Sequence, residues 1–229
     1  MTTPAALRVT TVAFRALIAA AACAGIVIEC AYGSAPRVLS FFTIWTNILV
    51  AVVFALSAVR VHRREPDVGP LWRGGVLLFI LVTGLVFHLV LDNPASPFNV
   101  VEDLDKLSGA RAVANQLLHT VTPVGAVLDF LLLTAPRRLR PRHAAQWLAY
   151  PLAYVVFALT RGALHSPGVR GRYTYPFIDV AEYGYARVAL NSLVLGIGFY
   201  ALGLALVALD HYRPPRENRI SSPAEGPLK

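Results

Sequence analysis

The chain has 229 residues, of which 56% are apolar and 15% are charged. An ordinary soluble domain is about a quarter charged, so this composition excludes disorder and argues against a soluble enzyme. The 21 basic and 13 acidic residues leave a formal charge of +8, which in a soluble protein would suggest nucleic acid. Here the charges lie in short clusters between long apolar runs, so we expect membrane lipid, and no nucleic acid, as the partner.

Six apolar segments are long enough to cross a bilayer, whose core of about 30 Å needs roughly 20 helical residues. They lie at residues 9–32, 41–59, 72–91, 112–134, 146–160 and 186–209. The fifth is short and is expected to begin within the basic loop before it. The sequence therefore predicts an all-α polytopic membrane protein, a six-transmembrane-helix bundle in one domain over residues 1–212. Residues 213–229 contain four prolines and predict a disordered cytoplasmic tail.

The placement of Lys and Arg predicts the orientation of the bundle, because cytoplasmic loops carry an excess of these residues. Thirteen of them flank one side of the predicted spans and seven flank the other. Both termini are therefore expected to be cytoplasmic. The long loops at residues 92–111 and 161–185 are then expected to lie outside.

Polar side chains inside the predicted spans are functional candidates, because each costs free energy in lipid unless it has a partner. Six of them come from five helices and fall in the outer half: Glu29, Thr43, Asn47, His88, His119 and Asn191. We expect this cluster to form the functional site. For the Thr and Asn residues the alternative is a hydrogen bond that only holds helices together. His88 also lies near enough to the headgroups to be an interfacial side chain.

His119 lies deeper in its span than His88 and is the stronger candidate for chemistry. Asn115, His119 and Thr122 share one helical face at i, i+4 and i+7. Pro123 follows His119 by four residues, so the carbonyl of His119 loses its usual N–H partner and the helix is expected to kink. A bent, hydrated helix beside an imidazole suits catalysis better than plain packing.

Arg15 and Asp129 lie at matched depth in the cytoplasmic half of their spans. We expect them to form a structural ion pair, which spares each side chain an uncompensated charge in the bilayer. The alternative is that each side chain reaches the interface separately.

The outer loop at residues 161–185 contains a run of aromatic residues that includes Tyr173, Tyr175, Phe177 and Tyr183. Long loops in compact proteins are often lids or binding segments. This segment is therefore expected either to close over the polar cluster or to serve as an interfacial aromatic anchor.

Three stretches resemble the androgen-induced-gene-type integral membrane proteins, whose animal members are threonine hydrolases of fatty acid esters of hydroxy fatty acids. They are Phe42-Thr43-Ile44-Trp45-Thr46-Asn47, Asn115 to Pro123, and Tyr175-Pro176-Phe177. The resemblance covers most of the chain outside the tail and implies Thr43 and His119 as the catalytic pair. Only two lysines accompany frequent arginine, alanine and valine, which resembles a bacterial branch from a high-GC genome. We therefore expect a multi-pass protein of the bacterial inner, or plasma, membrane.

Ester hydrolysis needs a nucleophile, a base that takes its proton and a donor for the developing oxyanion. A threonine hydroxyl is inert at its own pKa, and His119 is the histidine deep enough to activate it. Substrate-binding and oxyanion candidates are Asn47, Trp45, Asn115, His88, Glu29, Asn191 and Tyr175. The expected substrate is a lipid ester that enters from the outer leaflet, and no cofactor or metal ion is expected.

Three other functions stay open at this point. His88 and His119, on adjacent spans, can be axial ligands of a b-type haem in a redox protein. Glu29, the histidines and Asp129 can serve a small-solute or proton transporter, although the sequence lacks the paired interrupted helices that support one. A zinc hydrolase would need His88, His119 and His165 to converge.

Overall fold

A computed structural model describes residues 4–107, 109–169 and 171–214. These residues form helices joined by turns and loops, without a strand among them. The helices are α1 (Pro4–Tyr32), α2 (Ala35–Val38), α3 (Phe42–His62), α4 (Pro70–Val86), η1 (Phe87–Leu91), α5 (Val101–Leu104), α6 (Gly109–Gln116), η2 (Leu117–Val121), α7 (Thr122–Leu132), α8 (Pro141–Trp147), α9 (Ala149–Leu164), η3 (Pro176–Ile178) and α10 (Val180–Tyr212). η1 and η2 are single π-helical turns and η3 is a 3₁₀ turn. Most of the predicted tail, residues 215–229, lies outside the described residues.

Five helical segments in the described part are long and apolar enough to cross a membrane. They are Ala5–Tyr32, Phe42–His62, Pro70–Leu91, Pro141–Leu164 and Val180–Tyr212. Each corresponds to one of the predicted spans, although the second begins at residue 42 instead of 41, and the short fifth prediction extends back through α8 to residue 141. The last segment bends at Gly184, whose φ of 71° and ψ of 163° are not helical, so its straight part begins close to the predicted start at residue 186.

The predicted fourth span, residues 112–134, is not among these five segments. It is helical from α6 through η2 to the end of α7, but Asn115, Gln116, His119 and Asp129 make it less apolar than the others. This polar segment packs on protein: α6 and η2 contact α1, while α7 contacts α1 and α4. Its polar side chains can therefore find partners within the bundle.

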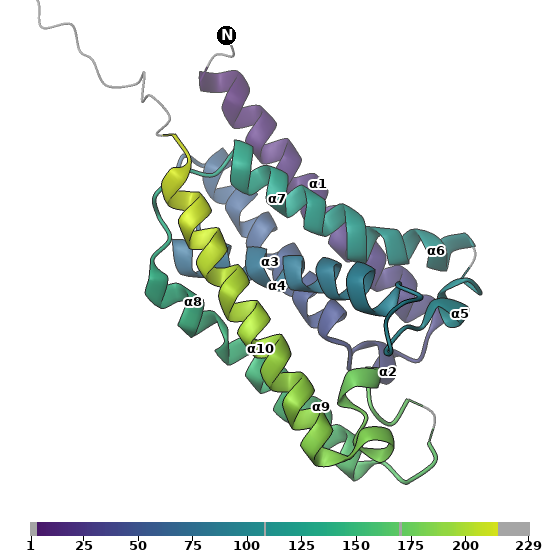
Figure 1. Ribbon diagram of the computed structural model, residues 1–229. Coiled ribbons are helices and arrows are strands. Elements are labelled where there is room, and N and C mark those ends of the chain that lie inside the picture. Colours follow the sequence, from purple (N-terminus) through teal and green to yellow (C-terminus); the bar gives the residue numbers. More distant parts are fainter. Residues whose placement is uncertain (1–3, 108, 170, 215–229) are drawn as a thin grey trace, which may run out of the picture.

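The helices form two groups (Figure 1). In the first group α1 packs along α3, and α4 packs against α3 and α7. In the second group α10 lies against α8 and η3 and also contacts α4. The start of α1 and the end of α10 lie at the same end of the bundle (Figure 1).

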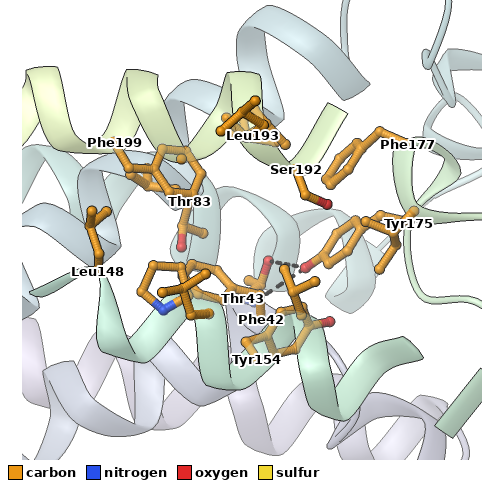
Figure 2. Close-up of a pocket in the computed structure, with 18 of the residues that line it drawn as sticks. Phe42, Thr43, Thr83, Leu148, Tyr154, Tyr175, Phe177, Ser192, Leu193 and Phe199 are labelled. Atoms are coloured by element: carbon orange, nitrogen blue, oxygen red, sulfur yellow. Dashed lines mark hydrogen bonds between the residues drawn. The ribbon is translucent and has the colours of Figure 1, made fainter. Parts of the chain in front are cut away.

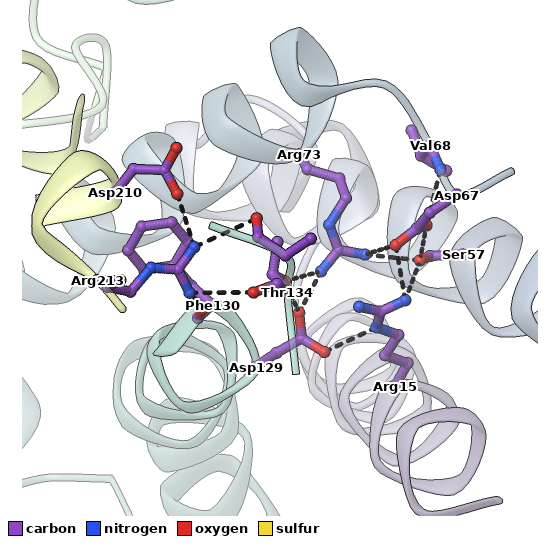
Figure 3. A network of polar contacts seen from close by, with 11 residues as sticks. Arg15, Ser57, Asp67, Val68, Arg73, Asp129, Phe130, Thr134, Asp210 and Arg213 are labelled. Atoms are coloured by element: carbon purple, nitrogen blue, oxygen red, sulfur yellow. Dashed lines mark hydrogen bonds and ion pairs between the residues drawn. The ribbon is translucent and has the colours of Figure 1, made fainter. Parts of the chain in front are cut away.

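At that end a buried network of charges joins four parts of the chain (Figure 3). Arg15, 1% exposed, donates from Nε to Asp129 Oδ1 at 2.7 Å. Its Nη1 donates to Ser57 Oγ and to Asp67 Oδ2, both at 2.8 Å. Arg73 donates to both carboxylates, Asp67 and Asp129. The structure therefore brings Arg15 and Asp129 together, within a network of two arginines and two aspartates instead of an isolated pair.

A second buried ion pair fixes the end of α10. Arg213 Nη2 donates to Asp210 Oδ1 at 2.6 Å, and the guanidinium carbon lies 4.0 Å from the centre of the Phe130 ring. Asp210 Oδ2 accepts the backbone N–H groups of Arg138 and Leu139 at 2.7 and 2.8 Å. The packed chain therefore extends through Arg213, one residue beyond the predicted end of the domain. The sequence pattern does not show the contacts of Arg213 with Asp210 and Phe130, so it places Arg213 in the tail.

The loop aspartate of the network predicts how stability depends on pH. Burial alone would raise the pKa of Asp67, but Arg73, the Ser57 hydroxyl and Arg15 outweigh it and lower the pKa below its ordinary 3.8. Such a carboxylate adds stability above the unfolded-state pKa, and this contribution is lost as the pH falls through the folded-state pKa. We therefore expect the Tm of the wild type to fall below about pH 4.

The matched variant is Asp67→Asn, which lacks this titration. Its Tm at pH 7 should be lower than that of the wild type, and its decline toward pH 3 should be shallower. Thermal unfolding of both proteins across this range checks the expectation. Parallel declines would show that Asp67 does not contribute in this way.

Candidate active site

Thr43 and His119 meet where the first turn of α3 faces η2. Thr43 Oγ1 lies 3.2 Å from His119 Nε2, and His119 Nδ1 lies 3.1 Å from the backbone carbonyl oxygen of Asn115. A carbonyl can only accept, so this contact requires the proton on Nδ1. Nε2 is then the acceptor for the Thr43 hydroxyl, which is the arrangement that a nucleophile and its general base need.

A π-helical turn positions His119. The sequence predicts a kink here because Pro123 has no N–H group for the carbonyl of His119. The structure instead widens the turn before the proline: the N–H of Thr122 donates to the carbonyl of Leu117, five residues earlier. A π-turn is one of the recognised ways in which a helix bends, and such turns occur frequently at functional sites.

Asn47 ties the two helices together one turn below Thr43. It is fully buried, and its Nδ2 donates to the carbonyls of Thr43 and Leu118 at 2.9 and 3.3 Å. Its Oδ1 accepts the Thr122 hydroxyl at 2.9 Å. Both amide hydrogens are therefore used. Asn47, expected as an oxyanion or substrate candidate, is placed as a brace between α3 and η2.

The end of α4 and the start of η1 form the wall beside His119. The Phe87 ring stacks on the imidazole with centroids 4.0 Å apart and an angle of 18° between the planes. One turn earlier, Gly84 lies against η2, where a Cβ would meet Pro123 Cβ and Cγ at 3.1 Å and the carbonyl oxygen of His119 at 3.2 Å. The absence of a side chain at residue 84 therefore permits the close approach that brings Phe87 onto His119.

Gly84→Ala is expected to destabilise the protein although alanine favours helix. Overpacking costs about 1–3 kcal/mol and the gain in helix propensity is about 1 kcal/mol, so the net loss is about 1 kcal/mol, or about 2–4 °C in Tm. The matched control is Gly198→Ala in α10, where a Cβ meets nothing within 4 Å, so its Tm should be unchanged or higher. A Gly84→Ala protein as stable as the control would contradict the close approach.

Tyr175 covers the site from the aromatic loop. The backbone N–H of Thr43 donates to Tyr175 Oη at 3.3 Å, and Oη lies 3.4 Å from Thr43 Oγ1. Because Oη accepts this N–H, its own proton can point toward Thr43 Oγ1 or toward a bound carbonyl. Burial raises the pKa of Tyr175, so the phenol remains a donor at neutral pH. Of the two expectations for this loop, closure over the site describes the position of Tyr175.

The other predicted site residues lie around this centre without joining it. Trp45 Nε1 donates to the carbonyl of Leu39 at 2.7 Å, so its donor is already used. Glu29 pairs with Arg111 at 3.7 Å. Asn115 contributes its backbone carbonyl to His119, as described above.

His88 is exposed and its Nε2 lies 3.1 Å from Thr120 Oγ1. A shared haem would require His88 and His119 each to present a free nitrogen to one iron. In the structure both ring nitrogens of His119 have protein partners, Thr43 and Asn115. This arrangement does not support the redox interpretation.

An apolar cavity of about 450 Å³ opens from the Thr43–His119 pair between α4, α9 and α10 (Figure 2). Such a volume lies within the range of small-molecule sites. Its walls are mainly aliphatic and aromatic and include Val86, Leu148, Leu152, Phe177, Leu193 and Phe199. The few polar groups on these walls include Thr43, His119, Tyr175 and Ser192.

A second cavity of about 670 Å³ reaches the same pair from the side of α1, α2, α5 and α6. Thr43, His119 and Tyr175 line both cavities, so the pair lies where the two meet. In contrast to the first, the second cavity is lined by many charged and polar residues: Glu29, Arg37, Asp103, Lys106, Arg111 and Asn115. An elongated molecule with an apolar and a polar end can therefore extend across the pair.

Three residues at these sites were not predicted from the sequence: Phe87, Ser192 and Arg73. Phe87 carries no signal, because an apolar residue in a span is ordinary. Ser192 follows Asn191 in α10, and its buried Oγ has no hydrogen-bond partner among the residues that the structure describes. Arg73, at the cytoplasmic end of the predicted span 72–91, is one of the thirteen basic residues on that side, and its side chain is 11% exposed and belongs to the buried network.

Comparison with protein-family models, with curated proteins and with solved structures finds no match for this chain.

Proposed function

We propose that this protein is an integral membrane hydrolase that cleaves lipid esters, with Thr43 as the nucleophile and His119 as the base. The fatty acid esters of hydroxy fatty acids implied by the sequence resemblance are the substrates to test first. One observation carries the proposal: Thr43 Oγ1 lies 3.2 Å from His119 Nε2, and the Asn115 carbonyl sets the proton on the other nitrogen.

The proposed reaction has two halves. Thr43 Oγ attacks the ester carbonyl carbon while its proton passes to His119 Nε2. The bond to the alcohol oxygen then breaks, the alcohol takes this proton, and an acyl-threonine remains. Water attacks the acyl carbon, His119 accepts its proton, and Thr43 leaves as the hydroxyl after recovering the proton. The Tyr175 hydroxyl is the proposed donor to the carbonyl oxygen, because it lies 3.4 Å from the attacking atom.

The two cavities support a lipid substrate. A fatty acyl chain fits the apolar cavity between α4, α9 and α10, where its burial is favourable. The polar part of the ester and the attacking water fit the charged cavity on the other side of the pair. The exposed large apolar residues of α9 and α10, such as Leu152, Val156, Leu190 and Ile197, suit lipid contact beside the apolar cavity.

For the membrane topology we propose six spans with both termini in the cytoplasm, in the inner membrane of a bacterium. The five apolar segments and the α6–η2–α7 segment supply the six crossings. The same-end position of the start of α1 and the end of α10 (Figure 1) is what an even number of crossings requires. The thirteen-to-seven distribution of basic residues supports the cytoplasmic location of that end.

The test is hydrolysis by the purified full-length chain in detergent. Release of fatty acid from a fatty acid ester of a hydroxy fatty acid is measured by mass spectrometry from pH 5 to pH 8. A general base must be neutral to accept a proton, so the rate should be retained at neutral pH and fall once acidification protonates His119. A rate that rises toward pH 5, or no release from this ester and from a simple aryl ester, would contradict the proposal.

A further inference from the structure

The wall of the apolar cavity contains a hydroxyl whose hydrogen-bonding capacity is unused. Ser192 Oγ is buried and has no hydrogen-bond partner among the residues that the structure describes. Ser192 lines the same cavity as Thr43, His119 and Tyr175. A buried polar group without a partner costs free energy, so native structures contain few of them and each calls for an explanation.

The helix itself offers Ser192 a way to avoid this cost. A serine or threonine inside a helix can turn its hydroxyl back to the carbonyl four residues earlier. Thr83, on the facing wall of the cavity, does so and donates to Phe79 O at 3.0 Å. Ser192 does not, and its hydroxyl therefore remains available to a molecule in the cavity.

The position of Ser192 relates it to the candidate oxyanion donor. The neighbouring Asn191 donates from Nδ2 to the carbonyl of Phe177 at 2.9 Å. The Phe177 ring in turn stacks on Tyr175 at 5.3 Å with an angle of 6° between the planes. This chain of contacts fixes the first part of α10 against the loop that carries Tyr175. Figure 2 shows Ser192 beside Tyr175 and Phe177, on the side of the cavity across from Thr43.

We propose that Ser192 donates a hydrogen bond to the ester carbonyl oxygen of the substrate and, with Tyr175, stabilises the oxyanion formed when Thr43 attacks. This inference rests on the proposed function. Ser192 forms and breaks no covalent bond and keeps its proton. Its hydroxyl gains a partner only when substrate is bound, and the bond strengthens as negative charge develops on the oxygen.

The kcat and the Tm of Ser192→Ala should therefore change in opposite directions. The kcat should fall by about 100-fold, as for loss of one oxyanion donor, while KM stays near the wild-type value because the interaction acts mainly in the transition state. The Tm without substrate should rise by about 2–4 °C, because an unpaired buried hydroxyl has been removed. Ser192→Thr keeps a hydroxyl and should recover much of the kcat.

The matched control is Thr11→Val in α1, which removes a buried hydroxyl that has a partner. Thr11 Oγ1 donates to Leu7 O at 2.8 Å, so this variant should have a slightly lower Tm and an unchanged kcat. A fall in both Tm and kcat in Ser192→Ala would indicate a structural hydroxyl and overturn the inference. A wild-type kcat in Ser192→Ala, with hydrolysis still lost in Thr43→Ala, would also overturn it but leave the proposed function intact. Full hydrolysis by Thr43→Ala would overturn both.

Discussion

Thr43→Ala, His119→Ala and the double variant are each expected to lower the rate of lipid-ester hydrolysis by about 10⁴-fold or more, and to a similar extent. In the proposed mechanism the two residues act as one unit, because the attacking hydroxyl is activated only through the imidazole 3.2 Å away. Once either is removed, the other has no function left to lose. Steady-state hydrolysis rates of the three purified variants check this expectation.

Two further variants sharpen this comparison. Thr43→Ser keeps the hydroxyl and should retain part of the activity, although the loss of the methyl group frees its rotamer. His88→Ala removes an exposed histidine that is hydrogen-bonded to Thr120. Among the described residues, His88 has no hydrogen bond to Thr43 or to His119. The His88→Ala variant should hydrolyse esters at nearly the wild-type rate. Losses that multiply in the double variant, or full activity in His119→Ala, would contradict the pairing.

The largest effect on stability is expected from the buried charge network. Arg15→Leu leaves Arg73 with two aspartates, and Asp129→Leu leaves two arginines with one aspartate. Each single variant thus leaves an uncompensated buried charge, at a cost of about 3–5 kcal/mol, or roughly 6–20 °C in Tm. The double variant leaves Arg73 with Asp67 and restores neutrality, so it should be more stable than the sum of the single effects predicts.

Thermal unfolding of the wild type, both single variants and the double variant gives the coupling between the two residues. The control is Lys106→Ala, which breaks the exposed pair with Asp103, where the side chains are 70% and 62% exposed. Its Tm should change little, because exposed ion pairs contribute little. Additive effects of Arg15→Leu and Asp129→Leu would show that the two charges do not compensate each other.

The apolar helices could be predicted from the sequence because an apolar run of about 20 residues reports directly on the bilayer. Five of the predicted spans match apolar helices of the structure within a few residues at most boundaries. The exceptions have a local cause. His119, Thr122 and Asp129 in residues 112–134 bond to other helices of the bundle, so that segment is helical but less apolar than the others. The fifth segment gains α8, which begins at Pro141, a residue favoured in the first turn of a helix.

The centre of the candidate site was also within reach of the sequence. Thr43 and His119 were selected from depth, helical face and the resemblance, and the structure brings them together. The details around them depend on contacts between distant segments and carry no local signal. Pro123 predicts a bend, but only the structure shows a π-turn there, in which the N–H of Thr122 donates to the carbonyl of Leu117.

Polar residues are where sequence reasoning was least specific. Asn47 and Trp45 were candidates for the oxyanion, yet their donors are used by backbone carbonyls. His88 shares the depth of the site but lines neither cavity, and Glu29 lines the second cavity but pairs with Arg111, because depth along a helix does not fix the direction of a side chain. Ser192 had no distinguishing pattern, since its significance lies in a partner that it lacks.

The most direct test of Thr43 as the nucleophile is to locate the adduct left by a fluorophosphonate that reacts with serine and threonine hydrolases. Intact membranes containing the full-length chain are treated, the protein is digested, and the modified peptide is identified by mass spectrometry. The adduct is expected on Thr43 in the wild type and on no residue in His119→Ala, where the hydroxyl has no base. An adduct on another residue with Thr43 unmodified, or undiminished labelling in Thr43→Ala, would contradict the proposed mechanism.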